Sequence, residues 1–402
     1  MKLRGSYGTT GNTSVNNSMT YMSWSTSPAW VYGGMYNVNV GSLVGPLGSN
    51  GLKWETTANL DLGFDYGLFD NRINGSFAWY TQDISDLILS ANVQPSVGYA
   101  NTQIYENVGD LKNWGFEFNI SSVNIEKRGF VWKTDFNIST NKNKVKALND
   151  TEKGKGAIND NNNTIRKEGE ALNTYYMCNS MGVDPEKGIY MIEQINADLW
   201  NNEFRTETTG TIIPATTTNV ANNRMIQHGK TDLPKFYGGM VNSFFYKGFD
   251  LYVQFNYAGG HYLRSMLHNE CDRMITEVNA IRDMVGNTWE KPGDKAKYPQ
   301  LMGDHSYYYD NDGNPSPTRT TFGERRFTTV YLFKGDYLRL RILQLGYTLP
   351  SSVLGKNNLH SLRFYIGGSN LLTFTKFKGL DPETLGELPI PQTFNFGISL
   401  NL

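Results

Sequence analysis

The chain has 402 residues, of which 19% are charged and 13% are aromatic, and its formal net charge at pH 7 is -1. With Lys and Arg scattered along the chain, this near-neutral balance argues against a nucleic-acid-binding protein. No run of about 18 apolar residues is present, as a helical membrane protein would require. A charged content below the roughly 25% of soluble domains, together with many aromatic residues, is typical of a transmembrane β-barrel.

The N-terminal part of the chain predicts one strand and a long polar loop. The strand covers residues 1–8, and a loop rich in Gly, Asn and Ser follows to residue 52. Aromatic side chains crowd this loop and can stack on sugar rings or peptide side chains, although anchoring at the membrane interface or packing within the loop is an alternative. The candidates for ligand or partner contact are Trp24, Trp30, Tyr32 and Tyr36 here, and Tyr307, Tyr308 and Tyr309 in a later loop.

The clearest strand pattern lies at residues 54–68. Even positions from Trp54 to Leu68 are mostly apolar and odd positions mostly polar, a period of two that puts the two kinds of side chain on opposite faces. A membrane-crossing strand needs about 9–11 residues, so this one is long enough. We expect its apolar face to contact lipid and its polar face to line a watery lumen, either simply solvated or in contact with a ligand. The lumen-facing candidates are Glu55, Asn59, Asp61 and Asp65.

Similar alternation along the rest of the chain predicts a series of antiparallel hairpins. A short helix inside a long loop is expected within residues 265–290, and two weaker strands are expected near 172–181 and 188–194. The other strands are expected at 73–79, at 114–121, at 130–139, in a hairpin at 235–262, on both sides of a turn at 350–358, and at 394–402.

The connections between these roughly 12 strands sort by length, which is a property of outer-membrane barrels. A β-sandwich with Greek-key crossovers would not sort its loops in this way. We therefore predict an all-β fold, an antiparallel transmembrane β-barrel. The short connections, expected on the inner side, are 70–71, 127–129, 182–188, 246–248 and 350–358, and the long ones, expected on the other side, are 9–52, 90–110, 149–171, 195–234, 265–328 and 375–391.

One stretch, residues 337–349, departs from simple alternation. Its apolar residues occupy even positions as far as Ile342 and odd positions from Leu343 onward. A slip of one residue exchanges the two faces of a strand. The pattern predicts a β-bulge near Ile342 and Leu343, or an end of the lipid-facing band there.

The chain shows no residue constellation for catalysis, so we expect no enzyme, no cofactor and no metal site. Asp310, Asp312 and Asn314 have the spacing of a calcium loop, but a proline stands where that loop needs glycine. The histidines lack ligand spacing. Cys178 and Cys271 lie far apart in sequence, and either a disulfide or two unrelated thiols is compatible with that spacing.

Several blocks of sequence resemble the SusC/RagA family of TonB-dependent outer-membrane transporters. The segments YLRLRILQLGYTLP, GSNLLTFTKFKGLDPE and PQTFNFGISLNL are similar to the family's closing strands, and ENVGDLKNWGFEFNI and GVDPEKGIY are similar to earlier segments in the same order. The resemblance covers nearly the whole chain and weakens at residues 195–234 and 300–326. Several blocks in one order are more specific than any single block.

The resemblance implies a 22-stranded barrel that an N-terminal plug domain fills. Residues 1–402 would then be the C-terminal part of the barrel, without plug or signal peptide. Because the first strand would have an unpaired edge, we expect a curved open sheet that does not seal as a functional barrel by itself.

The family's function implies an energised importer of oligosaccharides or peptides in the bacterial outer membrane. Its expected partners are a SusD-like lipoprotein over the extracellular side, the TonB complex acting through the N-terminal part, and membrane lipid. Two alternatives stay open: a siderophore- or cobalamin-type TonB-dependent receptor, and a soluble secreted β-rich lectin or adhesin.

Overall fold

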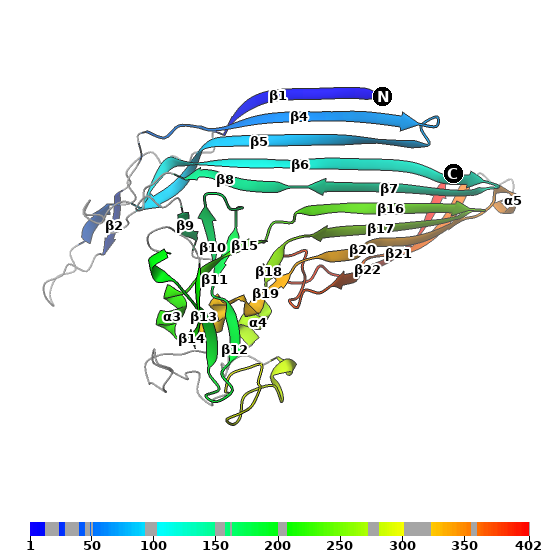
Figure 1. Ribbon diagram of the computed structural model, residues 1–402. Helices are drawn as coiled ribbons and strands as arrows, with labels where there is room; N and C mark the ends of the chain where they lie inside the picture. Colours follow the sequence, from blue (N-terminus) through cyan, green and yellow to red (C-terminus); the bar gives the residue numbers. More distant parts are fainter. Residues whose placement is uncertain are drawn as a thin grey trace.

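The structure, a computed structural model, is mainly β-sheet (Figure 1). In the part that it describes, no helix has the length and apolar character needed to span a membrane. The described residues are 1–12, 24–28, 40–44, 49, 51–92, 103–148, 157–160, 163–199, 207–271, 281–300, 323–354 and 360–401.

One 11-stranded antiparallel sheet forms the body of the molecule, which agrees with the predicted fold class. Its strands coincide with the alternating segments of the sequence, because a long strand keeps one apolar and one polar face only if its residues alternate. β8 (Lys142–Leu148) lies off the main path and pairs with β6. The path is β1 (Lys2–Asn12), β4 (Glu55–Leu68), β5 (Ile73–Asn92), β6 (Gln103–Lys127), β7 (Phe130–Thr140), β16 (Phe236–Tyr246), β17 (Phe249–Gly259), β20 (Tyr337–Thr348), β21 (Ser361–Thr375) and β22 (Thr393–Asn401).

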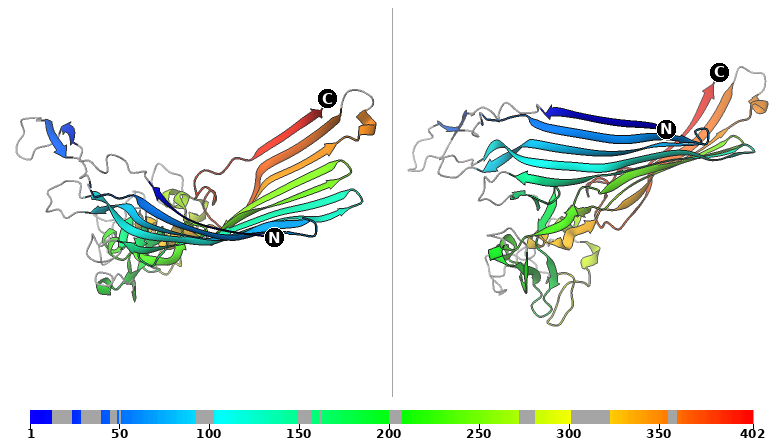
Figure 2. Two further views of the ribbon diagram at one scale, coloured as in Figure 1. Left: turned by 90° about the horizontal axis from the view of Figure 1, so that it is seen from above. Right: turned by 45° about the horizontal axis from the view of Figure 1, so that its top comes forward.

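The sheet is curved and open, as expected (Figure 2). Within the described residues, β1 pairs only with β4 and β22 pairs only with β21. All residues of β1 are exposed. Such edges present N–H and C=O groups that lipid cannot satisfy.

Short turns join the strands at one end of the sheet, which we call the short-turn end (Figure 1). Two of them are tight hairpin turns, at Arg128 with Gly129 and at Lys247 with Gly248, and all four residues have positive φ. Positive φ at both central residues is what a type I′ turn requires, and its twist matches that of the flanking strands. The opposite end carries the long connections and is called the long-loop end.

Strands are present near residues 172–181 and 188–194 as expected, but counting them among the barrel strands is wrong. These residues form short strands in two small sheets at the long-loop end, so the connection 182–188 does not belong to the short-turn end. Removing two strands leaves the up-and-down alternation unchanged, and the remaining connections therefore still sort by length as predicted. The path through the main sheet accordingly has ten strands, and β8, which the sequence did not predict, is the eleventh strand of the sheet.

The described parts of residues 157–231 and 262–334 form what we call the rim subdomain, below the long-loop end of the sheet in Figure 1. An isolated parallel β-bridge, a backbone pairing between Cys178 and Thr328, joins these two parts of the chain. The elements are β9 (Ala157–Asp160), β10 (Thr164–Lys167), β11 (Thr174–Met177), β12 (Ser180–Val183), β13 (Tyr190–Ile195), β14 (Thr208–Pro214), α3 (Thr217–Asn222), β15 (Met225–Thr231), β18 (Tyr262–Arg264), α4 (Met266–Cys271), η2 (Arg282–Met284), η3 (Gly323–Phe327), η4 (Thr329–Tyr331) and β19 (Leu332–Lys334).

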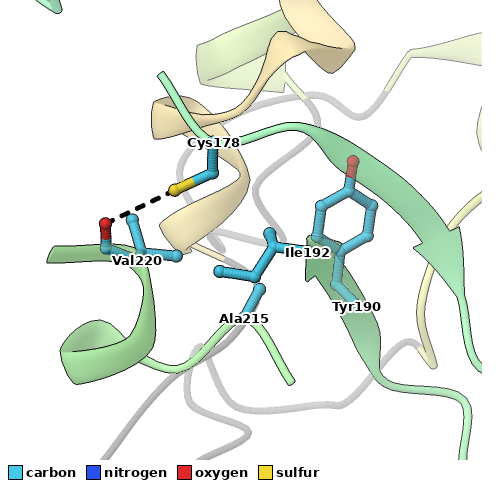
Figure 3. Close-up of a cluster of buried hydrophobic side chains, with 5 residues drawn as sticks. All are labelled: Cys178, Tyr190, Ile192, Ala215 and Val220. Carbon is cyan, nitrogen blue, oxygen red and sulfur yellow. Dashed lines mark hydrogen bonds between the residues drawn. The ribbon is translucent and has the colours of Figure 1, made fainter. Parts of the chain in front are cut away.

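The rim subdomain has a buried apolar core of the kind found in soluble proteins. Cys178, Tyr190, Ile192, Ala215 and Val220 pack together, each at most 1% exposed (Figure 3). The Cys178 thiol donates a weak hydrogen bond to the Val220 carbonyl. No disulfide joins Cys178 to Cys271, so the disulfide alternative is wrong.

Three short elements lie outside these two bodies. β2 (Trp24–Pro28) and β3 (Val40–Val44) form a two-stranded sheet within the first long connection. α5 (Ser351–Leu354) occupies the turn between β20 and β21. The short helix expected within residues 265–290 corresponds to α4.

The register aligns the polar positions of neighbouring strands on one face of the sheet and their apolar positions on the other face. Asp61 lies opposite Ser6 and Tyr80, and we call this side the polar face. Leu62 lies opposite Trp79 on the other side, the apolar face, where it is 48% exposed. Exposed apolar rows of this extent are what a lipid-facing surface requires. Other exposed side chains of the apolar face are Leu3, Tyr7, Phe116, Phe249, Leu338, Leu345, Phe364, Ile366, Leu372, Phe374, Phe394, Phe396, Ile398 and Leu400.

The predicted bulge in β20 is present. The register with both neighbouring strands shifts between Leu340 and Ile342: Arg341 is an extra residue relative to β17, whereas Asn370 and Leu371 of β21 both lie opposite Arg341 on the other side. The shift keeps Leu338 and Leu345 on the apolar face and Arg339 on the polar face. The bulge thus reconciles the change of parity in the sequence with one continuous apolar band.

Candidate functional site

The polar face of β4 holds the acidic and amide residues that the sequence singled out. Asn12 Nδ2 donates a hydrogen bond to Glu55 Oε2 (2.7 Å), and Arg4 Nε lies 3.3 Å from Asp65 Oδ1. Glu55 and Asp65 therefore help to join β4 to β1. Their positions follow the predicted parity, but these contacts give both side chains a structural role.

Asn59 and Asp61 instead border a polar hollow of about 550 Å³. Asn59 Oδ1 is buried and has no hydrogen-bond partner within the described residues. A buried acceptor of this kind favours a bound donor, because burying it unpaired is unfavourable. The lining residues are Asn59, Leu60, Asp61, Tyr80, Thr81, Gln82, Asn113, Glu117 and Asn141.

Tyr80 borders this hollow because Gly115 leaves room for its ring. The Tyr80 hydroxyl reaches across β6 and donates to the Thr140 carbonyl and to Asn141 Oδ1, both at 3.2 Å. A Cβ at position 115 would lie 1.9 Å from the Thr140 oxygen and 2.8 Å from the Tyr80 hydroxyl. The sequence shows the alternation of these strands but not this packing across three of them.

Nearer the short-turn end, a two-point ion pair crosses the polar face. Arg363 Nε and Nη2 donate to Asp250 Oδ1 and Oδ2 at 3.0 and 2.6 Å. Asp250 is on β17 and Arg363 on β21, so the pair spans β20, where Gly346 lies beneath it. A Cβ at position 346 would come within 2.4 Å of Asp250 Oδ1. Bidentate arginine–carboxylate pairs are geometrically specific, and this one fixes the relation of three strands.

A buried ionic clamp fixes the loop at residues 376–392 to the wall. Arg339 of β20 bonds Asp381 through Nη2, and its Nε lies 2.9 Å from Glu383 Oε2. Burial alone would raise the pKa of the Asp381 carboxyl, but hydrogen bonds from Arg339 and from the Glu383 and Ile390 backbone N–H groups lower the pKa below its usual value. The carboxylate is therefore held in its charged form.

A second buried arginine holds the rim subdomain together. Arg325 is 1% exposed, and its guanidinium carbon lies 5.0 Å from the ring centroids of Tyr190 and Tyr298 and 5.5 Å from that of Tyr331. Cation–π attraction is strongest when the cation is desolvated in this way. Through Arg325 and these three tyrosines, β13 packs against two segments that lie more than a hundred residues later in the chain. The burial of Arg325 makes this cluster a structural element and not an open binding site.

Most of the sequence-predicted aromatic candidates lie outside the described residues. These are Trp30, Tyr32, Tyr36, Tyr307, Tyr308 and Tyr309, and the weak calcium-loop pattern at 310–315 lies there too. The backbone of Trp24 belongs to β2. Among the residues that are described, no group of three or more His, Cys, Asp or Glu is arranged to hold a metal ion.

Sequence comparison identifies the fold. The family described as TonB dependent receptor-like, beta-barrel matches residues 1–371. TonB-dependent receptor P3 of Formosa agariphila is 32% identical over 99% of this chain and 39% of its own length. TonB-dependent receptor SusC of Bacteroides thetaiotaomicron is 25% identical over 100% of this chain and 37% of its own. The chain thus spans about two fifths of the length of these curated relatives.

Comparison with solved structures gives the same fold. The RagAB peptide transporter superposes with a TM-score of 0.75 at 24% identity, covering 99% of this chain and 40% of the solved one. The "open-open" state of the RagAB peptide importer gives 0.76 at 23% identity, covering 100% and 40%. The apolar face of the sheet and these matches together rule out the soluble lectin or adhesin alternative. The chain belongs to the TonB-dependent receptor β-barrel family, is of the SusC/RagA type, and resides in the bacterial outer membrane.

Proposed function

We propose that this chain forms part of a TonB-dependent importer of oligosaccharides or peptides that works with a SusD-like lipoprotein. The relatives support the type of transporter, since one is named SusC and the solved structures are of a peptide transporter. On this proposal the polar face of the sheet lines the lumen through which the nutrient passes. The TonB complex supplies the energy.

The polar hollow beside Asn59 and Asp61 carries the proposal. Its amides, carboxylates and tyrosine can donate and accept hydrogen bonds, which are the groups needed to hold sugar hydroxyls or peptide amides. The acidic groups Asp61 and Glu117 also make it unsuited to an anionic ligand. The hollow would serve as a contact point on the inward path, with Asn59 Oδ1 as one acceptor.

The long-loop end is the proposed contact surface for the lipoprotein and for arriving nutrient. It carries the rim subdomain and the sheet of β2 and β3, to which Trp24 belongs. The other aromatic candidates, Trp30, Tyr32, Tyr36, Tyr307, Tyr308 and Tyr309, are proposed as contacts from the sequence alone. Rigid support below long loops is the usual arrangement for binding surfaces.

The test is uptake by cells that carry the full-length protein. A strain lacking the gene should lose uptake of at least one labelled oligosaccharide or peptide, and the variant with Asp61→Asn and Glu117→Gln should show several-fold slower uptake at normal outer-membrane levels. The matched control changes Asp70→Asn and Glu126→Gln, two exposed carboxylates at the short-turn end, away from the proposed contact surface. Normal uptake of every oligosaccharide and peptide with loss of iron–siderophore or cobalamin uptake would instead support the alternative receptor class.

A further inference from the structure

A row of lysines follows one face of β8, the strand that continues β7 toward the long-loop end. In the sequence KNKVKAL, Lys142, Lys144 and Lys146 are exposed, whereas Val145 and Leu148 between and after them are buried. Lys142 and Lys144 alternate with Val145, which therefore faces the other side of the strand. Lys146 is an extra residue in the register with β6, and this shift turns Leu148 to the side of Val145. The lysines thus share one exposed surface.

The register shows that this surface continues the apolar face of the barrel wall. Lys142 lies opposite Trp114, and Lys144 lies opposite Lys112 on β6. Phe116, 48% exposed on the apolar face, is two residues from Trp114, which corresponds to about 7 Å along a strand. The lysines therefore begin where the lipid-facing band ends, at the depth of the lipid headgroups.

A cavity of about 400 Å³ lies beside these lysines, where the wall opens between β8 and the segment leading into β16. The strands are still joined below it, where the Asn141 N–H donates to the Lys235 carbonyl. Trp114, Lys142, Lys144 and Lys235 line the cavity together with Asn141, Asn143, Gly169, Ala171, Thr231 and Leu233, so three of its lining residues are lysines. Tryptophan favours this depth because its ring is apolar and its N–H is polar.

The charges in the cavity are not neutralised within the described residues. Asp83 is the nearby carboxylate on this surface, and it pairs with Lys146 (3.1 Å) and Lys112 (3.7 Å). Lys142 and Lys144 have no ion-pair partner in the described part of the chain. The two cavity lysines on the apolar-face side are therefore available to an anion.

We propose that this cavity binds a phosphate group of an anionic glycolipid in the outer leaflet. Lys142 and Lys144 contact the phosphate, Trp114 packs beside the sugar–acyl boundary, and the acyl chains lie along the apolar face toward Phe116. Lysine binds phosphate as a strong point charge, and basic residues beside a membrane attract anionic lipids. The position at the headgroup level selects a lipid over a free phosphate ion, because only a lipid also covers the apolar surface below.

The test is native mass spectrometry of the full-length protein in neutral detergent, titrated with purified lipopolysaccharide. The variant Lys142→Gln with Lys144→Gln should bind about 30-fold more weakly, as expected for two lysines at an anionic surface. The control Lys291→Gln with Lys295→Gln removes the same charge from exposed positions of the rim subdomain and should bind like the wild type. Equal heat-induced unfolding of the two variants shows that both are folded.

Two further binding experiments test whether the lipid phosphate is the group that the lysines recognise. Dephosphorylated lipopolysaccharide should bind the wild type as weakly as intact lipid binds the lysine variant. Inorganic phosphate should fail to displace the intact lipid at matched concentration. The proposal is overturned if the lysine variant retains wild-type affinity, if dephosphorylation has no effect, or if inorganic phosphate competes equally well.

Discussion

Arg339 and Asp381 form an ion pair that is almost fully shielded from solvent, with side-chain exposures of 2% and 5%. The two residues lie 42 positions apart, on β20 and on the loop at residues 376–392. Such a pair is stabilising only while both partners remain, because a single buried charge without its counterion is very unfavourable. The loop is therefore fixed to the wall at one charged point.

Arg339→Met should release this loop. Removing one partner of a buried pair costs about 3–5 kcal/mol, so we expect a lower unfolding temperature in detergent and new protease cleavage within residues 376–392. Arg341→Met is the matched control, because Arg341 is one-third exposed and lies 3.7 Å from Glu383. Its effect should stay below about 1 kcal/mol. Equal effects of the two substitutions would contradict the clamp.

The membrane sheet was predictable from sequence, because each face of a long strand meets one solvent. Asp61 and Leu62 lie on the faces that their parity indicates, and the parity change near Ile342 correctly predicted a bulge. Lysine–glycine and arginine–glycine pairs also marked the tight turns. In each case the structural cause is local to a few consecutive residues.

The rim subdomain and the buried charges were not predictable in this way. All four residues of β11 are buried, so no alternation distinguishes that strand from a weak membrane strand. The core of the rim subdomain depends on the contact of Cys178 with residues near Thr328. The ionic clamp joins Arg339 to Asp381 in a loop 42 positions later in the chain. The sequence shows each charge but not its partner.

Gly346 should be intolerant of a side chain. A Cβ there would lie 2.4 Å from Asp250 Oδ1 and 2.5 Å from Arg363 Nη2, so Gly346→Ala must open the ion pair. We expect the free energy of unfolding to fall by about 1–3 kcal/mol. The measurement is the temperature at which heating changes the mobility of the protein on gels, which should be lower in the variant. Gly8→Ala is the control, because nothing lies within 4 Å of a Cβ at that position of β1.

Gly346→Ala combined with removal of Asp250 tests whether disruption of the Asp250–Arg363 ion pair causes the loss of stability. In a background with Asp250→Ala, the loss caused by Gly346→Ala should be much smaller, because the two changes disturb one interaction. Strictly additive losses would show that another contact opposes the side chain at position 346.

His261 should make the junction of the rim subdomain sensitive to acid. It is 1% exposed, and burial lowers its pKa below the usual value, with Asp336 and Asp232 opposing that shift in part. Because the unfolded chain binds a proton more readily, the stabilising contribution is present above about pH 6.5 and is lost as the pH falls toward the folded pKa. The protection factors of the β18 and β19 amides, which compare the measured exchange with the intrinsic exchange at the same pH, should fall below pH 6.5 in the wild type.

Replacement of the histidine isolates this effect. His261→Gln removes the titrating group, so the protection factors of the β18 and β19 amides should no longer depend on pH between 5 and 7. His228→Gln, at an exposed ring paired with Glu170, should leave the dependence of these strands unchanged. Persistent acid sensitivity in the His261 variant would assign it to another group.

The central claim is that alternate residues of the long strands face lipid and water. The most direct measurement places single cysteines at positions 59 to 65 of the full-length protein in outer-membrane vesicles, with Cys178→Ala and Cys271→Ala, and compares quenching of an attached probe by lipid-soluble and water-soluble reagents. Leu60, Leu62 and Phe64 should be quenched from lipid, and Asn59, Asp61 and Asp65 from water. Uniform quenching along the strand, or the opposite alternation, would contradict the account.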